Sequence, residues 1–241
     1  MKRGVLRLGL TLGVLLAAGV ASAAALSPRH AWLAWQVVTG AVVPPQVPVS
    51  ATEVAAEPEA LRLIRAGEAQ VGVTRRYDPA YVALDFPGGD VAADRGVCTD
   101  VLIRAMRAGW AIDLQLAVNR DMKAGFAAYP KTWGLSRPDR NIDHRRVPNL
   151  ETLLKRVGAQ VALDEGQPAA FLPGDIVTSR LPGNLPHVMI VSDRLSDDGV
   201  PLVIHNIGAG TREEDALFDY PLTAHFRVGS GAMARLERLG R

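Results

Sequence analysis

The sequence predicts an α+β domain in which helices come first and an antiparallel β-sheet follows. Apolar residues recur at helical spacing between residues 58 and 157, and short apolar runs separated by tight turns fill the rest of the chain. Helices followed by a run of strands argue for an α+β fold. Residues 58–241 are available to it, a length that fits one domain.

Before this domain, residues 1–23 have the pattern of a secretory signal peptide. Lys2, Arg3 and Arg7 form a basic start, residues 8–20 are an uncharged apolar core, and Ala21-Ser22-Ala23 is a small-residue cleavage site. The apolar run is short for a membrane span, and an uncleaved N-terminal anchor is the alternative. We therefore expect a periplasmic or secreted protein with no stable membrane span after cleavage.

Removal of residues 1–23 also changes the charge balance. The whole chain has a net charge of +2, whereas the part after residue 23 keeps 24 of the 27 Lys and Arg against 25 Asp and Glu, a net charge of −1. No basic run remains that would favour nucleic-acid binding, so we expect no nucleic-acid partner. Residues 24–57 contain Pro44, Pro45 and Pro48 and few charges, which predicts a Pro-rich linker or tether.

Four helices are expected at the start of the domain. Pro58 fits the first turn of a helix that runs to about Gln70. Cys98 begins the second helix, which buries Val101 and Leu102 and which Gly109 ends. The other two are expected at residues 118–128 and 150–157, the latter with Asn149 as its N-cap.

Four strands are expected in the second half of the domain. Each is a short apolar run bounded by turn residues, and the turn Ser196-Asp-Asp-Gly199 separates two of them. Short strands joined by tight turns predict an antiparallel meander. The expected strands lie at residues 175–180, 187–192, 201–206 and 225–228.

The only cysteine of the chain, Cys98, stands at the predicted start of a helix. Exported proteins normally pair their cysteines, and this one has no partner within the chain. A helix N-terminus lowers the pKa of a thiol and favours the nucleophilic thiolate. We therefore predict a nucleophile, the alternative being a small buried hydrophobic residue.

A cysteine nucleophile needs a base and a group that orients the base. Of the five histidines, His187 begins a predicted strand and His205 lies on the next one, so the two can be cross-strand neighbours. In that arrangement His205 would hold the imidazole of His187 in one tautomer. The alternative for either histidine is a hydrogen-bonded structural role.

A long polar loop, residues 133–148, carries four arginines, and loops of this length in compact domains are usually functional or disordered. Arg140, Arg145 and Arg146 suit bidentate binding of a substrate carboxylate, with Asp143 in the same site. Alternatively, they form internal ion pairs with Asp139 and Asp143. The run Asp143-His144 lacks the three or four converging ligands of a zinc site, so no metal is expected.

Several of these motifs together resemble the NlpC superfamily of papain-like cell-wall peptidases and amidases. They are the cysteine at a helix start, Pro173-Gly-Asp175-Ile-Val, His187-Val-Met-Ile-Val and Leu-Val-Ile-His205. The resemblance implies a papain-like domain in which the nucleophile helix packs on the sheet. It also implies Cys98 as nucleophile, His187 as base and His205 as third residue.

The resemblance leaves two assignments open. Asn206 is the rival for the third role, because papain relatives often use asparagine there and neighbouring strand positions point to opposite faces. The superfamily often has a tyrosine before the nucleophile helix, so Tyr77 or Tyr81 is a candidate oxyanion donor, with Asp100 as a further pocket residue. Packing roles are the alternative for the tyrosines.

A second resemblance is closer. Gly96-Val-Cys98-Thr-Asp100-Val, Asp113-Leu-Gln115, the run 138–145 and His205-Asn-Ile-Gly208 resemble a bacterial family known as domain of unknown function 1287, over about residues 60–228. The chain departs from the better-known NlpC members, which have Asp-Cys-Ser-Gly where it has Val-Cys-Thr-Asp.

The expected activity is hydrolysis of an amide or peptide bond in the periplasm through a Cys-His-His triad and a thioester, without a cofactor. The expected substrate is a peptidoglycan stem peptide or another amide. The alternatives are a non-catalytic cell-wall-binding or scaffolding module and an acyltransferase that uses the same thioester. The sequence does not indicate an oligomeric state.

Overall fold

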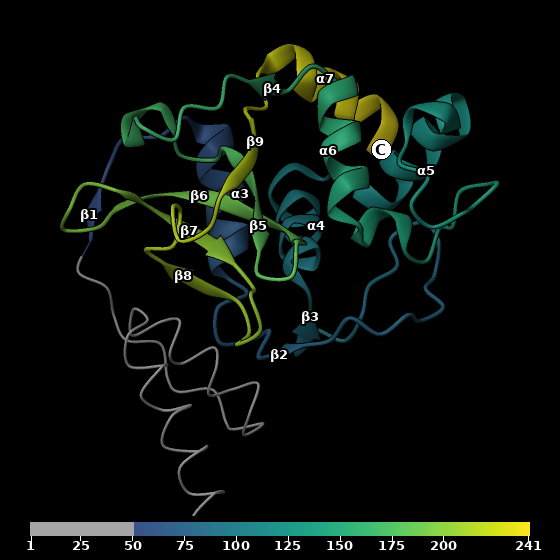
Figure 1. Ribbon diagram of the computed structural model, residues 1–241, viewed down its shortest axis with the longest axis horizontal. Coiled ribbons are helices and arrows are strands. Elements are labelled where there is room, and N and C mark those ends of the chain that lie inside the picture. Colours follow the sequence, from purple (N-terminus) through teal and green to yellow (C-terminus); the bar gives the residue numbers. More distant parts are fainter. Residues whose placement is uncertain (1–50) are drawn as a thin grey trace, which may run out of the picture. The chain divides into compact units, whose positions relative to one another are not determined.

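A seven-stranded antiparallel sheet organises the protein, whose computed structural model describes residues 51–241 (Figure 1). Along the sheet the order is β4-β9-β5-β6-β7-β8, and β1 pairs with β6. The predicted α+β class is confirmed. β5, β6 and β7 form the predicted meander, but the fourth predicted strand, β9, does not continue it beside β7 and instead pairs with β5. The strands are β1 (Thr52–Glu53), β4 (Gln160–Val161), β5 (Ile176–Leu181), β6 (Leu185–Leu195), β7 (Pro201–His205), β8 (Arg212–Glu214) and β9 (Leu222–Phe226).

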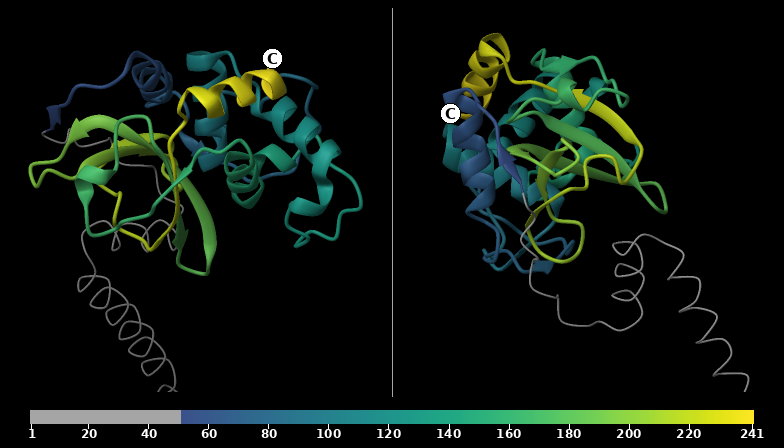
Figure 2. Two further views of the ribbon diagram at one scale, coloured as in Figure 1. Left: turned by 90° about the horizontal axis from the view of Figure 1, so that it is seen from above. Right: turned by 90° about the vertical axis from the view of Figure 1, so that its left-hand side faces the viewer.

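The helices pack on one side of this sheet and share its main core (Figure 2). On β6, Val188 and Ile190 point into the helices, whereas Met189 and Val191 belong to the apolar cluster on the other face, as the two-residue period of a strand requires. The helices are α3 (Pro58–Glu68), α4 (Cys98–Trp110), α5 (Leu114–Gly125), α6 (Val147–Arg156) and α7 (Ser230–Gly240), with 3₁₀ turns η1 (Phe126–Ala128), η2 (Asp143–Arg145) and η3 (Pro168–Ala170).

Gly109 was expected to end α4 but lies inside it. A Cβ at Gly109 would stand 2.6 Å from the Arg62 carbonyl oxygen, so this glycine lets α3 and α4 approach closely. Ala111 ends the helix instead, in a left-handed conformation with φ of 55°. Gly109 is therefore required by the close packing of α3 and α4 and does not mark the end of α4.

Other helix boundaries differ because side-chain contacts set them. α5 begins at Leu114 rather than 118, since the Asp113 carboxylate accepts a hydrogen bond from the Gln115 N–H and caps the helix. α6 begins at Val147, and Asn149 lies inside it, where its Nδ2 donates to the Asp143 carbonyl at 3.0 Å.

Several further elements lie outside the predicted ranges. β9 covers residues 222–226 instead of 225–228, and α7 was not predicted. β1 falls within the predicted linker 24–57, where Thr52 pairs with Leu195 and the Val54 N–H donates to the Asp193 carbonyl. The signal peptide and the rest of that linker lie outside the described residues. Within residues 51–241, no helix has the length and apolar character needed to cross a membrane.

Candidate active site

Cys98 is the first residue of α4. The segment that leads into it is held in place by strand pairing and by a helix cap. β2 (Arg76–Tyr77) pairs in parallel with β3 (Arg95–Gly96), which leads directly into α4. The Asp100 carboxylate accepts a hydrogen bond from the Val97 N–H at 2.7 Å and so caps the helix. A Cβ at Gly96 would stand 3.0 Å from the Asp100 side chain, so glycine suits this position.

The Cys98 thiol is buried, with 4% of the residue exposed. Burial raises the pKa of the Cys98 thiol to about 11, although backbone N–H groups of Val188, Thr99 and Cys98 itself act in the opposite direction. The expectation that the helix N-terminus gives Cys98 a low pKa was therefore wrong. The thiol is neutral at pH 7, and a nucleophilic attack requires a base that takes its proton.

A row of three polar side chains crosses β6, β7 and β8 on one face of the sheet. Nε2 of His187 lies 2.8 Å from Nδ1 of His205, and Nε2 of His205 lies 3.0 Å from Oε1 of Glu214. Both histidines are buried. Burial, with a smaller contribution from His205, holds the pKa of His187 well below its ordinary value, so this imidazole is neutral and can accept a proton.

The structure places His205, and not Asn206, against His187. The Asn206 side chain donates to the Gly96 carbonyl at 3.0 Å and accepts from the Gly208 N–H at 3.1 Å. It therefore ties the end of β7 to the segment that enters α4. His205 thus faces His187, and Asn206 holds the segment that leads to Cys98.

The thiol meets β6 where β7 ends. Ile190 pairs with Ile204, and continuing this register places Asn206, one residue past β7, opposite Val188. The Val188 N–H is directed at the Cys98 sulfur, next along the chain from His187. Within residues 51–241, Nδ1 of His187 has no hydrogen-bond partner. Thiol–imidazole pairs often tighten only when substrate binds.

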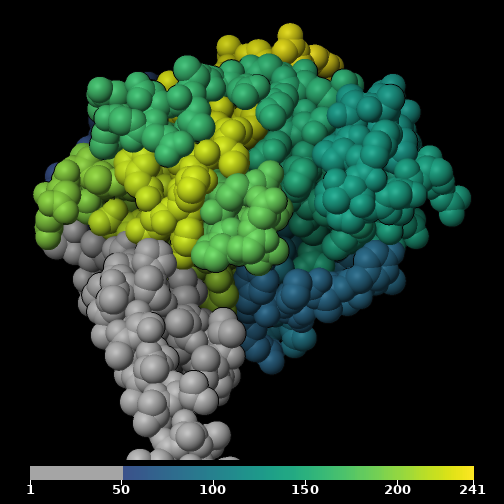
Figure 3. Space-filling view, in the orientation of Figure 1, coloured from purple at the N-terminus to yellow at the C-terminus, as the bar shows by residue number. Residues whose placement is uncertain are grey.

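A cavity of about 200 Å³ opens onto Cys98. The segment before α4, the long loop 133–148 and the β5–β6 hairpin line it, and Figure 3 shows these three parts of the chain meeting at the surface. The lining is mainly apolar, which suits a site that excludes water around a reacting bond. Besides Cys98, the lining residues are Tyr77, Pro79, Val97, Trp133, Ile142, Arg145, Arg146, Val147, Pro148 and Pro186.

Of the two candidate tyrosines, Tyr77 lies at this cavity and Tyr81 does not. Although 42% of Tyr77 is exposed, desolvation on its cavity side and the negative charges that Cys98 and Asp100 can carry raise the pKa of its hydroxyl, which stays a hydrogen-bond donor. The Tyr81 hydroxyl instead donates to Asp139 at 3.1 Å and accepts from Asn141 at 2.9 Å. Tyr81 thus organises the loop 133–148.

Arg145 is not available for a substrate carboxylate, which corrects our expectation. Its Nε and Nη2 bind the two Asp100 oxygens at 2.9 and 3.0 Å, and its Nη groups also donate to the carbonyls of Ala80 and Asp78. The side chains of Arg145 and Asp100 are 2% and 3% exposed. Asp100 is therefore an internal ion-pair partner and helix cap rather than a pocket residue.

The other charged residues of this loop have three different surroundings. Asp143 is buried and accepts from the Asp139 N–H at 2.6 Å and from Arg146 at 2.8 Å, so it is structural and does not bind substrate. Arg140 is exposed, with its guanidinium 5.9 Å from the centre of the Phe86 ring and away from the cavity. Arg146 does line the cavity, where its guanidinium stacks on Trp133 at 4.1 Å.

Sequence reasoning missed two residues of this site. Glu214 stands on β8, a strand of three residues that the sequence did not reveal, and only its proximity to a candidate histidine marks it. Trp133 was seen as part of the long loop but not as a cavity wall. Its signal was the aromatic residue at the start of an arginine-rich loop, where a guanidinium can stack.

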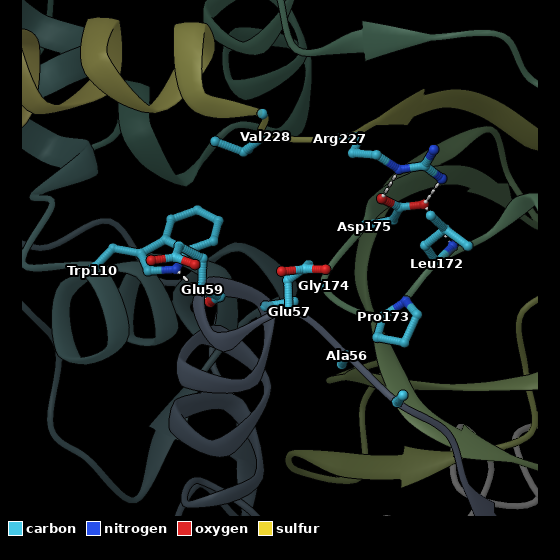
Figure 4. A pocket seen from close by; sticks show the side chains of 13 residues that line it. Ala56, Glu57, Glu59, Trp110, Leu172, Pro173, Gly174, Asp175, Arg227 and Val228 are labelled. Carbon is cyan, nitrogen blue, oxygen red and sulfur yellow. Dashed lines mark hydrogen bonds and ion pairs between the residues drawn. The ribbon is translucent and has the colours of Figure 1, made fainter.

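A larger cavity, of about 420 Å³, lies elsewhere and shares no lining residue with the one at Cys98 (Figure 4). Its guanidinium, Arg227, binds the Asp175 carboxylate at 2.7 and 2.8 Å, and Trp110 donates to the Glu59 carbonyl at 2.8 Å. These polar groups are thus paired with one another, so size alone does not make this cavity the candidate site.

Comparison with known proteins places the chain among its relatives. The family described as "Domain of unknown function (DUF1287)" matches residues 64–228. The chain belongs to this family. It is also 49% identical over 183 residues to "Uncharacterized protein YijF" of Escherichia coli, which covers 76% of this chain and 88% of that protein. The predicted resemblance to this family is confirmed, and Cys98, His187, His205 and Glu214 all lie within the matched residues.

Proposed function

We propose that this protein is a cysteine hydrolase that cleaves an amide or peptide bond, with Cys98 as nucleophile and His187 as base. One observation carries the proposal: the single thiol lies at a helix N-terminus and at a cavity, against the N–H of Val188, and the residue before Val188 is His187, a buried neutral imidazole whose Nε2 is held by His205. His205 is the residue that orients the base.

The protonation states define the first chemical step. Both thiol and imidazole are neutral at pH 7, because burial raises the pKa of Cys98 and lowers that of His187. Sγ forms a bond to the substrate carbonyl carbon while its proton passes to Nδ1 of His187. The carbonyl π electrons move to oxygen, and the positive charge on His187 is stabilised by its contact with His205.

The remaining steps return the enzyme to its starting state. The C–N bond breaks as His187 gives the proton to the leaving amine, which leaves a thioester on Cys98. Water then attacks the thioester with His187 as base, and the acid and the free thiol are released. The Cys98 backbone N–H and the Tyr77 hydroxyl are candidate donors to the oxyanion, since both lie at the cavity.

The arrangement of elements supports a papain-like fold of the NlpC type. In that superfamily a nucleophile at a helix start packs against an antiparallel sheet that carries the histidine base and the third residue on successive strands. Here α4 begins with Cys98, and β6 and β7 carry His187 and His205. The resemblance in sequence and this order of elements point to the same superfamily.

For the substrate we propose a peptide of the bacterial cell wall, encountered after export. The N-terminal pattern of residues 1–23 supports a periplasmic or secreted location. Arg146 lies at the cavity wall beside Trp133 with one Nη bound to Asp143, and unlike Arg145 it keeps donor groups at the cavity that suit a carboxylate such as those of peptidoglycan stem peptides. Arg146 is the one residue of the four expected substrate-binding residues that we retain in this role.

The test is mass spectrometry of purified sacculi incubated with the protein. We expect newly released stem-peptide fragments with the wild type and none with Cys98→Ala. One observation, the burial of the thiol, favours a non-catalytic wall-binding module, which predicts sedimentation with sacculi that Cys98→Ala does not change and no released fragments. An acyltransferase would instead add an amine acceptor to the fragments. Either result would overturn the proposal.

A further inference from the structure

We propose that Glu214 is a positioning residue that fixes the protons of the His187–His205 pair and thereby makes His187 a base toward Cys98. This inference rests on the proposed function and extends it to a residue outside the triad. Glu214 touches neither the thiol nor the cavity lining, so it acts through His205.

The strand register brings Glu214 to His205. On β8, Arg212 pairs with His205 and Glu214 pairs with Val203, so the carboxylate lies two residues along the strand from the position opposite the histidine. From there its Oε1 reaches Nε2 of His205 at 3.0 Å. The His205 side chain is 2% exposed and that of Glu214 is 21% exposed, so the carboxylate forms the outer end of a row that runs inward.

The proton positions follow from the chemistry of the three groups. A carboxylate only accepts hydrogen bonds, so Nε2 of His205 carries a proton and donates it. Neutral His205 then has a lone pair on Nδ1, which accepts from Nε2 of His187. With its proton on Nε2, His187 has a lone pair on Nδ1, which is the nitrogen without a partner in the described part of the chain.

The opposite arrangement would disable the base. If His205 donated from Nδ1 to Nε2 of His187, the His187 proton would lie on Nδ1 and the imidazole could not take the thiol proton. Two hydrogen-bonded histidines do not by themselves favour one direction. A charged acceptor at one end of the row does, because it binds a donor and not a lone pair.

The same carboxylate stabilises the charge that forms during the reaction. When His187 takes the thiol proton, its positive charge lies in a buried row that ends at Glu214. Other titratable or charged groups on the strands and turns beside this row include Arg212, whose backbone pairs with His205, and Tyr220, whose pKa is raised by burial and by the charges of Asp219 and Glu214.

The first experiment reads the tautomers directly and does not require activity. In the protein labelled with ¹⁵N-histidine, long-range ¹H–¹⁵N spectra report which ring nitrogen carries the proton. We expect Nε2–H for both His187 and His205 in the wild type and a mixture in Glu214→Gln. Nδ1–H on His187 in the wild type, or unchanged tautomers in Glu214→Gln, would overturn the inference.

The second experiment follows alkylation of Cys98 by iodoacetamide between pH 5 and 9, together with melting temperature. We expect Glu214→Gln to slow alkylation at pH 7 by about 10- to 100-fold, by analogy with the loss of an outer hydrogen-bond partner of a metal-binding histidine. We also expect the acid limb of its pH profile to move down by about one unit, since a nearby carboxylate favours the protonated row. Glu214→Asp should restore part of the rate, and Glu165→Gln, the same change at an exposed position, should alter nothing.

The outcomes separate the two proposals. If His187→Ala leaves alkylation and hydrolysis unchanged, the proposed function fails whatever Glu214 does. If His187→Ala abolishes both while Glu214→Gln keeps the wild-type rate and pH profile, the function stands and the positioning role is refuted. If Glu214→Gln lowers the melting temperature but does not shift the acid limb of the pH profile, Glu214 only stabilises the fold, and the positioning role is again refuted.

Discussion

Replacement of Arg145 by methionine tests whether the arginines of the loop 133–148 hold the fold or bind substrate. Methionine keeps much of the side-chain volume but leaves the Asp100 carboxylate buried without its guanidinium, and frees the carbonyls of Asp78 and Ala80. Breaking a buried ion pair by removing one partner costs about 3–5 kcal/mol. At about 2–4 °C per kcal/mol for a domain of this size, the melting temperature should fall by roughly 6–20 °C.

The assay is urea denaturation and thermal melting of the wild type, Arg145→Met and a double variant that also carries Asp100→Asn. The double variant removes both charges while keeping an acceptor for the Val97 N–H, so it should recover more than half of the lost stability. Arg140→Met, an exposed change in the same loop, should leave the melting temperature nearly unchanged. An Arg145→Met protein of wild-type stability, with a raised KM for a carboxylate substrate, would refute this reasoning and restore the binding role.

Four further predictions concern the site itself. Cys98→Ala should abolish hydrolysis with little change in melting temperature, as a hydrolysis and melting assay can show; retained activity would exclude a cysteine mechanism. In His187→Ala, alkylation should rise with pH up to about 11, because the raised pKa keeps Cys98 a thiol below that value; a plateau near pH 9 would contradict it. His205→Ala should lower turnover by about 10² to 10⁴ with the fold retained. Asn206→Ala should mainly lower the free energy of unfolding, by about 1–3 kcal/mol, because it breaks the hydrogen bond to Gly96. The reverse result would make Asn206 the third residue. Arg146→Gln should raise KM more than it lowers kcat on a defined stem peptide, and an unchanged KM would exclude it from substrate binding.

Local signals predicted the parts of the fold that depend on neighbouring residues in the chain. Pro58 marks the start of α3, and the tight turn at residues 196–199 separates β6 from β7. The start of α4 at Cys98 was likewise readable from the sequence. The strand period also predicted that only one of His205 and Asn206 can face His187, which the structure shows. It could not tell which one, because that depends on where β7 lies relative to β3.

Long-range packing decided what the sequence could not reveal. Arg145 lies in a loop whose nearest acidic residues are Asp139 and Asp143, yet it binds Asp100, 45 residues away, because η2 packs against the start of α4. Burial likewise reverses the expected effect of the helix N-terminus on Cys98, since the desolvation of a thiolate outweighs the nearby N–H groups. Both predictions considered only the helix or loop that contains the residue. The residues that pack against it from elsewhere in the chain decide its role.

The hydrogen bonds of the two buried histidines make the strongest argument that this site is chemical rather than structural. Of the four ring nitrogens of His187 and His205, three have partners within residues 51–241, in a row that ends on Glu214. The fourth, Nδ1 of His187, belongs to the residue next to Val188, whose N–H is directed at the only thiol of the chain. A purely structural pair would gain stability from an acceptor or donor at that nitrogen, whereas a base must keep its lone pair free until the thiol proton is transferred.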